Sequence, residues 1–434
     1  MKVIQRGRIN NYQTINDNVK YRYSKYVIKQ NNGNYNILYN ALNDFCVILN
    51  INEKNVKSFL IKHWFLVPED FNEFEYAKNI KDSKILKNLE REIKTITTYT
   101  ILPTTDCNAN CSYCFEFGAR KLNMTKKTAD DVIKYIVKNA PEDKKINVRW
   151  FGGEPLYNSE IIDYITENLI SLGFNFKSSI ITNGYLANEE IADKFVNSWK
   201  IKTCQITIDG VNEIYNSVKN YIYEDDENCF ATVIKNVKTL LSRGVQLSIR
   251  LNITENNTQD LIELIDYLYN EFGKSKLLTV YCTPVYDFFK NEPELAFNNF
   301  EIVMKYIITK YGYKRGLRKL VTNGSKCMAN NNRAVVINPI GKISLCEHDV
   351  DCRAIGDIIN GIDNSSPIIK EFREYLFLPD KCPTCKIYPI CMKAKLCAGD
   401  GFCSDPKIRF ELLRITRALN VILRRYINEQ KREA

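Results

Sequence analysis

The stretch that decides the fold is Cys107-Asn-Ala-Asn-Cys111-Ser-Tyr-Cys114, which follows a predicted strand at residues 97–103. Its thiols are separated by three and two residues, so a loop that folds back on itself can hold three corners of an iron-sulfur cube. The fourth iron would then have no protein ligand. The same spacing also suits a zinc ribbon that lacks its fourth ligand. The sequence beyond the loop must therefore decide between an iron-sulfur cluster and a zinc site.

Three later segments favour iron. An apolar strand predicted at residues 146–151 runs into Gly152-Gly153-Glu154-Pro155, and glycine allows a backbone to approach a ligand closely because it has no Cβ. Two further strand ends carry Thr182-Asn183-Gly184 and Arg250. An arginine can pair with a carboxylate, although a structural role for Arg250 is equally open.

In these positions the sequence resembles the radical S-adenosylmethionine (radical SAM) enzymes. The resemblance implies that Cys107, Cys111 and Cys114 bind a 4Fe-4S cluster whose open iron takes the amino and carboxylate groups of S-adenosylmethionine. An electron from the cluster then cleaves the sulfonium to a 5'-deoxyadenosyl radical. The implied contacts are to adenine, the methionine amino group, the ribose or methionine, and the methionine carboxylate. The residues implied for these contacts are, in the same order, Tyr113; Gly152, Gly153 and Glu154; Thr182 and Asn183; and Arg250.

Length and composition predict a chain with two or three domains. The 434 residues are 45% hydrophobic, which argues against disorder. No signal-peptide pattern opens the sequence and no apolar run reaches the length of a membrane span, so we expect a soluble cytoplasmic protein. Fifteen cysteines clustered at short spacings, with only His63 and His348 as imidazoles, favour metal ligation through sulfur over disulfides.

The formal net charge of +10 does not point to nucleic acid. Lysine and arginine are mixed with acidic residues along the predicted helices, and the densest run, residues 407–432, is typical of a solvated helix face. We therefore expect neither a nucleic-acid nor a membrane partner.

The first 95 residues predict a small module of their own. Strands are expected at residues 26–30, 35–39 and 45–49, and helices at residues 52–64 and 72–94. The arrangement resembles the winged-helix elements that bind leader peptides in enzymes modifying ribosomally made peptides. In such modules the leader adds a strand to a sheet edge. A capping module without a ligand is as compatible with the residues.

Between residues 97 and 284 strands and helices alternate as in a parallel α/β unit. The pattern predicts an α/β fold, a partial (β/α)6 TIM-like barrel open on one side, with its ligands at the carboxyl ends of the strands. The expected strands are residues 97–103, 146–151, 178–182, 203–208, 247–253 and 277–283. The expected helices are residues 125–139, 159–172, 188–199, 231–242, 257–272 and 298–311.

The C-terminal cysteines resemble the SPASM extension, which carries two auxiliary 4Fe-4S clusters. By that resemblance Cys327, Cys346 and Cys397 hold the first cluster, and the second is held by Cys382, Cys385, Cys391 and Cys403. Five residues separate Cys391 from Cys397 where the family usually has three, and Cys352 is an alternative ligand or a fourth one. A zinc ribbon is the minority interpretation of residues 382–403. The scattered Cys46, Cys204, Cys229 and Cys282 are expected to be core residues.

These assignments divide the chain into four parts: residues 1–95 for leader recognition and a bridging helix, 96–315 for the barrel, 316–405 for the auxiliary clusters and 406–434 for a terminal helix. The reaction also needs a proton acceptor. Candidates are Glu347, His348 and Asp349, which follow Cys346, and Asp209 at a strand end. A solvated polar turn explains the first three better, and a helix cap explains Asp209 equally well.

The first functional hypothesis is a peptide maturase of the streptide cyclase type, which cross-links a ribosomally made precursor through a carbon-carbon or thioether bond. It needs S-adenosylmethionine, three 4Fe-4S clusters and an electron donor such as flavodoxin or ferredoxin. An anaerobic sulfatase-maturating enzyme is the second hypothesis. The third is a non-catalytic iron-sulfur or zinc protein that binds nucleic acid.

Overall fold

The computed structural model describes residues 1–6, 13–16, 18–89, 92–114, 116–223, 228–311, 328–348, 353–374, 380–391 and 405–433. Within these ranges no helix is both long and apolar enough to span a bilayer.

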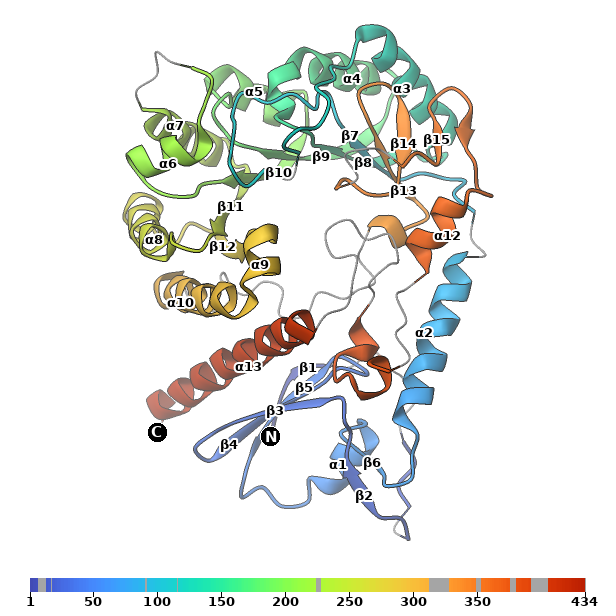
Figure 1. The fold of residues 1–434 in the computed structure, drawn as a ribbon, viewed down its shortest axis with the longest axis vertical. Helices are drawn as coiled ribbons and strands as arrows, with labels where there is room; N and C mark the ends of the chain where they lie inside the picture. The colour runs from blue at the N-terminus through green and yellow to red at the C-terminus, as the bar shows by residue number, and fades with distance from the viewer. Residues whose placement is uncertain are drawn as a thin grey trace.

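Six parallel strands form the centre of the fold, as the alternation predicts. They are β7 (Thr98–Ile101), β8 (Lys145–Trp150), β9 (Asn175–Thr182), β10 (Ile201–Thr207), β11 (Gln246–Ile253) and β12 (Leu278–Pro284), each paired with the next. In the described part of the chain β12 ends the sheet, and β7 pairs on its far side with β13 rather than with β12. The barrel is therefore open, and its strands follow an arch (Figure 1).

Helices cover the outside of this arch (Figure 1). Side chains at alternate positions of each strand, such as Ile146, Val148 and Trp150 of β8, are buried in the core shared with them. Thr125 caps the first helix, since its hydroxyl accepts a hydrogen bond from the Thr128 backbone N–H. The helices are α3 (Lys126–Asn139), α4 (Ser159–Ser171), α5 (Glu189–Asn197), α6 (Asn212–Lys219), α7 (Cys229–Ser242), α8 (Thr258–Phe272) and α10 (Pro293–Tyr311).

The opposite face of the sheet is more polar. Arg149 on β8 and Arg250 on β11 alternate with the core residues of their strands and are partly exposed. The Tyr281 hydroxyl of β12 donates a hydrogen bond of 2.6 Å to Gln205 on β10. This inner face supplies the polar groups that a substrate inside the arch would meet.

The sheet continues beyond the six strands, which the sequence analysis did not predict. β13 (Ala334–Ile337) runs parallel to β7, and β14 (Lys342–Ser344), β15 (Gly356–Asp357) and β16 (Gly361–Ile362) follow in antiparallel order. These strands come from the region assigned to the auxiliary clusters. Its first part is therefore fixed to the barrel by backbone hydrogen bonds.

The N-terminal residues form a four-stranded antiparallel sheet in the order β1-β5-β4-β3. The three predicted strands are β3 (Val27–Asn32), β4 (Tyr35–Asn40) and β5 (Phe45–Asn50), while β1 (Lys2–Gln5) was not predicted. β2 (Tyr21–Tyr23) pairs with β6 (Leu66–Pro68), and the predicted first helix is shorter, α1 (Lys57–Lys62). The likeness to a winged-helix module remains a prediction.

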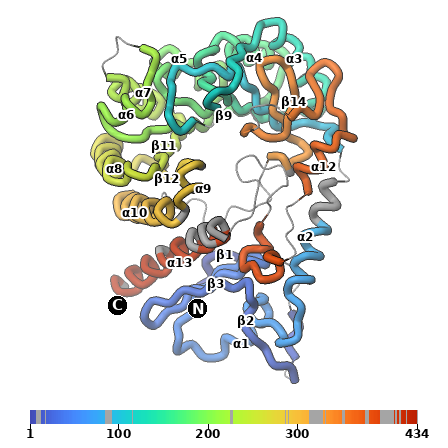
Figure 2. Tube along the Cα trace, in the orientation of Figure 1, coloured from blue at the N-terminus to red at the C-terminus, as the bar shows by residue number. Residues whose placement is uncertain are grey.

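This N-terminal sheet shares one apolar core with the C-terminal end of the chain. Tyr26 and Ile28 are buried together with Tyr388, Ile415 and Leu419. The long helix α13 (Asp405–Glu433) packs on β3 and β4, and α2 (Glu73–Leu89) runs from the N-terminal sheet along the side of the molecule (Figures 1 and 2). The two ends of the chain thus form one packed unit.

Two lysines strengthen this contact. Lys25 Nζ donates a hydrogen bond of 2.8 Å to the Pro383 carbonyl. Lys81 Nζ donates one of 3.1 Å to the Tyr388 carbonyl and lies 4.1 Å from the centre of the Tyr388 ring. The turn that carries Cys382, Cys385 and Cys391 is therefore held against the N-terminal domain.

Candidate active site

The cluster loop, residues 103–114, leaves the carboxyl end of β7. Thr104 fixes its start: the hydroxyl donates to Asn123 Oδ1 at 2.6 Å and accepts from the Asp106 N–H at 2.8 Å. Cys107 and Cys111 are partly exposed and Cys114 is exposed, and all three are free thiols. Burial raises the pKa of Cys107 to about 12, so a metal must displace its proton.

The Gly152-Gly153 pair at the end of β8 packs against the backbone of this loop. A Cβ on Gly152 would lie 2.1 Å from the Thr104 carbonyl oxygen, and one on Gly153 would lie 2.2 Å from the Asp106 carbonyl oxygen. The Glu154 N–H donates to that Asp106 oxygen at 2.9 Å. The close approach that these glycines allow is thus to the cluster loop itself.

Glu154 joins the ends of two strands. Its buried carboxylate accepts hydrogen bonds from the Thr182 hydroxyl at 2.7 Å, the Asn183 N–H at 2.7 Å and the Leu156 N–H at 3.0 Å. The Asn183 amide in turn donates to Asn108 in the cluster loop at 2.7 Å. Burial raises the pKa of Glu154 to about 7, against the effect of these hydrogen bonds. The predicted residues from β8 and β9 therefore meet at the cluster loop.

Tyr113 is bound to a buried ion pair. Its hydroxyl donates to Asp209 and accepts from Lys219 Nζ at 2.8 Å, and Lys219 Nζ lies 2.8 Å from Asp209 Oδ2. Burial alone would lower the pKa of Lys219, but the charge of Asp209 and then Tyr113 hold it well above its usual value. Asp209, predicted as a possible base, is thus matched with a cation. The sequence analysis missed Lys219, because it ends a helix, α6, that was not predicted.

A second group of predicted residues lies on the inner face of the sheet. Glu347 Oε2 pairs with Arg149 Nη1 of β8 at 2.7 Å, and Arg250 Nε donates to Asn252 Oδ1 at 2.9 Å. The pKa of His348 is lowered by burial and also by the charge of Arg250, while Glu347 opposes the shift. Glu347 is thus paired with Arg149, and Arg250 acts electrostatically on His348, although these residues come from segments far apart in the sequence.

The cysteines predicted to hold auxiliary clusters lie only in part within the described residues. Cys346 follows β14, and Cys382, Cys385 and Cys391 lie in two short turns against the N-terminal core. Cys46, Cys204, Cys229 and Cys282 are buried, as expected of core residues. The predicted ligands Cys327, Cys397 and Cys403, with Cys352 and Asp349, lie outside the described residues.

The donor set of the cluster loop fits a cubane cluster. Within the described ranges no three Cys, His, Asp or Glu side chains are arranged to hold a single metal ion. Each thiolate of a cubane binds a different iron, so its ligands need not converge on one point. Three free thiols on a loop fixed to the ends of β7, β8 and β9 meet that requirement.

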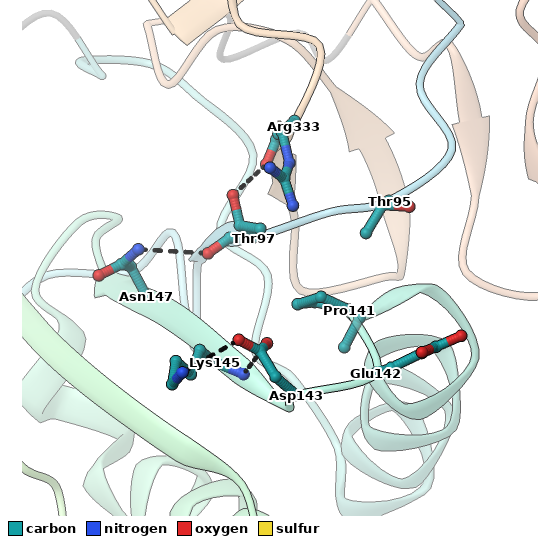
Figure 3. Close-up of a pocket in the computed structure, with 9 residues that line it drawn as sticks. Thr95, Thr97, Pro141, Glu142, Asp143, Lys145, Asn147 and Arg333 are labelled. Carbon is teal, nitrogen blue, oxygen red and sulfur yellow. Dashed lines mark hydrogen bonds and ion pairs between the residues drawn. The ribbon is translucent and has the colours of Figure 1, made fainter.

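A cavity of about 690 Å³ lies at the other end of the strands (Figure 3). It adjoins the amino ends of β7 and β8, where Thr97 bonds to the Arg333 carbonyl and Lys145 pairs with Asp143 at 3.2 Å. Several of its polar groups thus bond to one another, and it lies at the end of the strands opposite the cluster loop. It is therefore not the candidate active site.

Comparison with known proteins places this site in a family. Residues 101–268 match the sequence profile of the radical SAM superfamily. The uncharacterized protein MJ0907 of Methanocaldococcus jannaschii is 29% identical over 265 residues, which cover 59% of this chain and 86% of that protein. The radical SAM cyclopropyl synthase TigE of Paramaledivibacter caminithermalis is 21% identical over 424 residues, which cover 88% of this chain and 83% of TigE.

Among solved structures, native anSMEcpe with bound AdoMet has a TM-score of 0.59 at 17% identity, over 78% of this chain and 100% of that one. A second structure of the same protein, with AdoMet and the Cp18Cys peptide, has a TM-score of 0.58. At this identity the likeness shows the fold. Residues 101–268, which match the profile and carry the cysteine loop at the carboxyl ends of the strands, form a radical SAM domain.

Proposed function

We propose that this chain is a radical SAM peptide maturase that forms an intramolecular carbon-carbon or thioether cross-link in a ribosomally made precursor peptide. The observation that carries the proposal is the junction of Cys107-x3-Cys111-x2-Cys114 with the ends of β8 and β9 through Gly153 and Glu154. Three free thiols meet there with Gly152, Gly153, Glu154, Thr182 and Asn183, while Arg250 lies on the inner face of β11.

Cys107, Cys111 and Cys114 would hold a 4Fe-4S cluster, and residues at the ends of β8 and β9, with Arg250 within β11, would hold S-adenosylmethionine. When bound and reduced by a donor such as flavodoxin or ferredoxin, this pair supplies a 5'-deoxyadenosyl radical, which takes a hydrogen atom from the substrate. The chain's own part is to orient the two cofactors through the fixed loop, and to shield the site from water within the arch.

Cross-linking removes two hydrogen atoms from the peptide, so a second electron and a proton must also leave. We propose Glu347 as the proton acceptor, because it lies on the inner face beside Arg149 and directly follows Cys346. The two auxiliary clusters, with Cys346, Cys382, Cys385 and Cys391 among their ligands, would accept the electron. The order of seven cysteines supports this assignment.

The N-terminal sheet offers an edge for a leader peptide. In the described part of the chain β3 ends the sheet and pairs only with β4. Along an antiparallel strand, the backbone N–H and carbonyl of successive residues point alternately toward the partner strand and away from it. Two features show which residues of β3 point toward β4: the two-residue turn between Asn32 and Tyr35, and the hydrogen bond from the Ala41 N–H to the Tyr26 carbonyl. By that alternation the backbone N–H and carbonyl of Lys29 point away from β4. A peptide strand can bond to them there.

The substrate class draws support from two relatives. TigE is described as a cyclopropyl synthase, and the second anSMEcpe structure holds a peptide. Sulfatase maturation is the alternative function. The open edge of β3 distinguishes the two functions, since only an enzyme that binds a leader peptide needs such an edge.

Anaerobic incubation with S-adenosylmethionine, dithionite and a short precursor peptide encoded beside this gene tests the proposal. We expect 5'-deoxyadenosine and a peptide that has lost two hydrogen atoms. Formation of 5'-deoxyadenosine with conversion of a sulfatase Cys or Ser to formylglycine would instead support the alternative. Absence of 5'-deoxyadenosine from iron-loaded protein would reject both.

Leader binding needs a point variant, because deleting residues 1–95 would expose the core that Tyr26 and Ile28 share with Leu419. Lys29→Pro removes one outward N–H without breaking a β3–β4 hydrogen bond. We expect it to weaken peptide binding about tenfold, the loss of about one hydrogen bond. Lys29→Ala, which keeps the N–H, should bind as the parent does. If the parent, Lys29→Pro and Lys29→Ala bind the peptide equally well, the leader does not bind at this edge.

A further inference from the structure

Lys219 is buried at the carboxyl end of α6, beside the cluster loop. Its side chain is 3% exposed and that of its partner Asp209 is 1% exposed. Lys219 Nζ lies 2.8 Å from Asp209 Oδ2 and donates to the Tyr113 hydroxyl, also at 2.8 Å. Tyr113 completes a triangle by donating to Asp209. A residue of the cluster loop is thereby fixed to β10 and α6.

The main chain of Lys219 holds the same loop a second time. Its carbonyl oxygen accepts a hydrogen bond of 3.0 Å from the Asn110 N–H and lies 3.8 Å from Cys111 Sγ. The next residue, Asn220, adopts the left-handed conformation with φ of 47°, which turns the chain at the helix end. Residues 220–222 then run beside residues 108–110, with the Ile222 N–H bonded to the Asn108 carbonyl at 3.1 Å.

Both members of the buried pair make hydrogen bonds beyond the ion pair itself. Asp209 Oδ1 accepts a further bond of 3.1 Å from the Asn252 N–H of β11. Burying two charges costs free energy that their attraction offsets only when such bonds are made. A satisfied buried network of this kind adds little stability, but it makes the geometry unique and rigid.

We propose that Lys219 is a positioning residue that holds the cluster loop in its ligating shape before any cluster is bound. Its carbonyl fixes the backbone at Asn110 and its ammonium fixes Tyr113 through Asp209. The ammonium also lies beside the loop that would hold the cluster, where its positive charge would favour the reduced state. The inference deepens the proposed function and rests on it, since it takes Cys107, Cys111 and Cys114 as the ligands.

Hydrogen exchange on the wild-type chain, prepared without iron, tests the first part. We expect the peptide covering residues 107–114 to exchange slowly, like peptides of β7, because the clamp needs no cluster. Exchange at the rate of an unstructured peptide would overturn the proposal. The measurement does not depend on cluster binding, so it separates failure of the clamp from failure of the proposed function, which absence of iron after reconstitution would show.

Substitutions test the second part in the reconstituted enzyme. Lys219→Met removes the charge at similar length, and Lys219→Arg keeps it. We expect the midpoint potential of the cluster, followed by electron paramagnetic resonance, to become more negative in Lys219→Met and to return toward the parent value in Lys219→Arg. Lys194→Met removes a lysine that pairs with Asp163 at 2.9 Å in the outer helices, and should leave the potential unchanged.

If the cluster has the same midpoint potential in Lys219→Met as in Lys194→Met, the proposed electrostatic role of Lys219 is wrong. If Lys219→Met does not fold, Asp209→Asn removes the opposing negative charge instead, and a less negative midpoint potential is expected. Should neither variant fold, the exchange rate of residues 107–114 in the wild-type chain still decides for or against the clamp.

Discussion

Substitution of Gly153 by alanine should disable the cluster loop through one steric contact. The new Cβ would lie 2.2 Å from the Asp106 carbonyl oxygen and 2.7 Å from that of Thr105. Both neighbours are backbone atoms, so no side chain can rotate away. Gly153 does not have the positive φ found at Gly152, and alanine is therefore acceptable to its own backbone. The effect of the substitution is packing alone.

The size of the effect follows from the contacts. Restoring an ordinary separation requires residues 105–106 to retreat by about 1 Å. That shift breaks the hydrogen bond from the Glu154 N–H to Asp106, 2.9 Å, and the one from the Gly153 N–H to Thr104, 3.3 Å. Each is worth about 1 kcal/mol, and overpacking adds about 1–3 kcal/mol. We expect a local cost of about 4 kcal/mol.

Because Cys107 directly follows Asp106, the displaced segment carries a cluster ligand. The assay is iron and sulfide content after anaerobic reconstitution, with 5'-deoxyadenosine formation beside it. Gly153→Ala should lose most of its iron and its 5'-deoxyadenosine formation. The control is Gly244→Ala, at a helix end with φ of 81° and open space around it, which costs about 1–2 kcal/mol by strain alone. Full iron content in Gly153→Ala would refute this account of the glycine pair.

Three further predictions concern other parts of the molecule. Because folding raises the pKa of Glu154 to about 7 from about 4.3, its protonated form is favoured in the fold. The free energy of unfolding of the iron-free parent should therefore fall by up to about 3.5 kcal/mol more than that of Glu154→Gln between about pH 4.3 and 7, and equal slopes would contradict the burial. Glu347→Gln should cost less than about 1 kcal/mol of stability, since the pair is partly exposed, but lower cross-linked product about a hundredfold while 5'-deoxyadenosine persists. Arg149→Met breaks the same ion pair but keeps the Glu347 carboxylate, so it should still form cross-linked product. If Arg149→Met loses as much product as Glu347→Gln, the ion pair has a structural role instead. Lys81→Met should speed hydrogen exchange in residues 380–391 by removing a charged hydrogen bond worth about 2 kcal/mol, and unchanged exchange would mean that the shared apolar core suffices.

The barrel could be predicted because its information is local. Alternation of apolar residues along each strand, the Thr125 cap and the glycines at 173 and 244 fix where elements begin and end, and the structure confirms these elements. The meeting of the cluster loop with Glu154 and Asn183 followed from a general rule. Carboxyl ends of parallel strands lie at one edge of a sheet.

What the sequence could not predict depends on contacts between distant residues. The pairing of β13 with β7 joins segments more than two hundred residues apart, and nothing in Ala334–Ile337 indicates its partner. The shared core of Tyr26 and Tyr388 is another such contact. Lys219 gave no signal because a lysine near the end of a polar helix is usually solvated. Only the fold places it beside Asp209.

The most direct test of the account measures 5'-deoxyadenosine from S-adenosylmethionine and dithionite, under anaerobic conditions, for the parent and for the double variant Cys111→Ala, Cys114→Ala. We predict that the parent, loaded with iron and sulfide, forms the nucleoside and that the variant forms none. Undiminished formation by the variant, or a parent that binds zinc in place of iron and sulfide, would contradict the account.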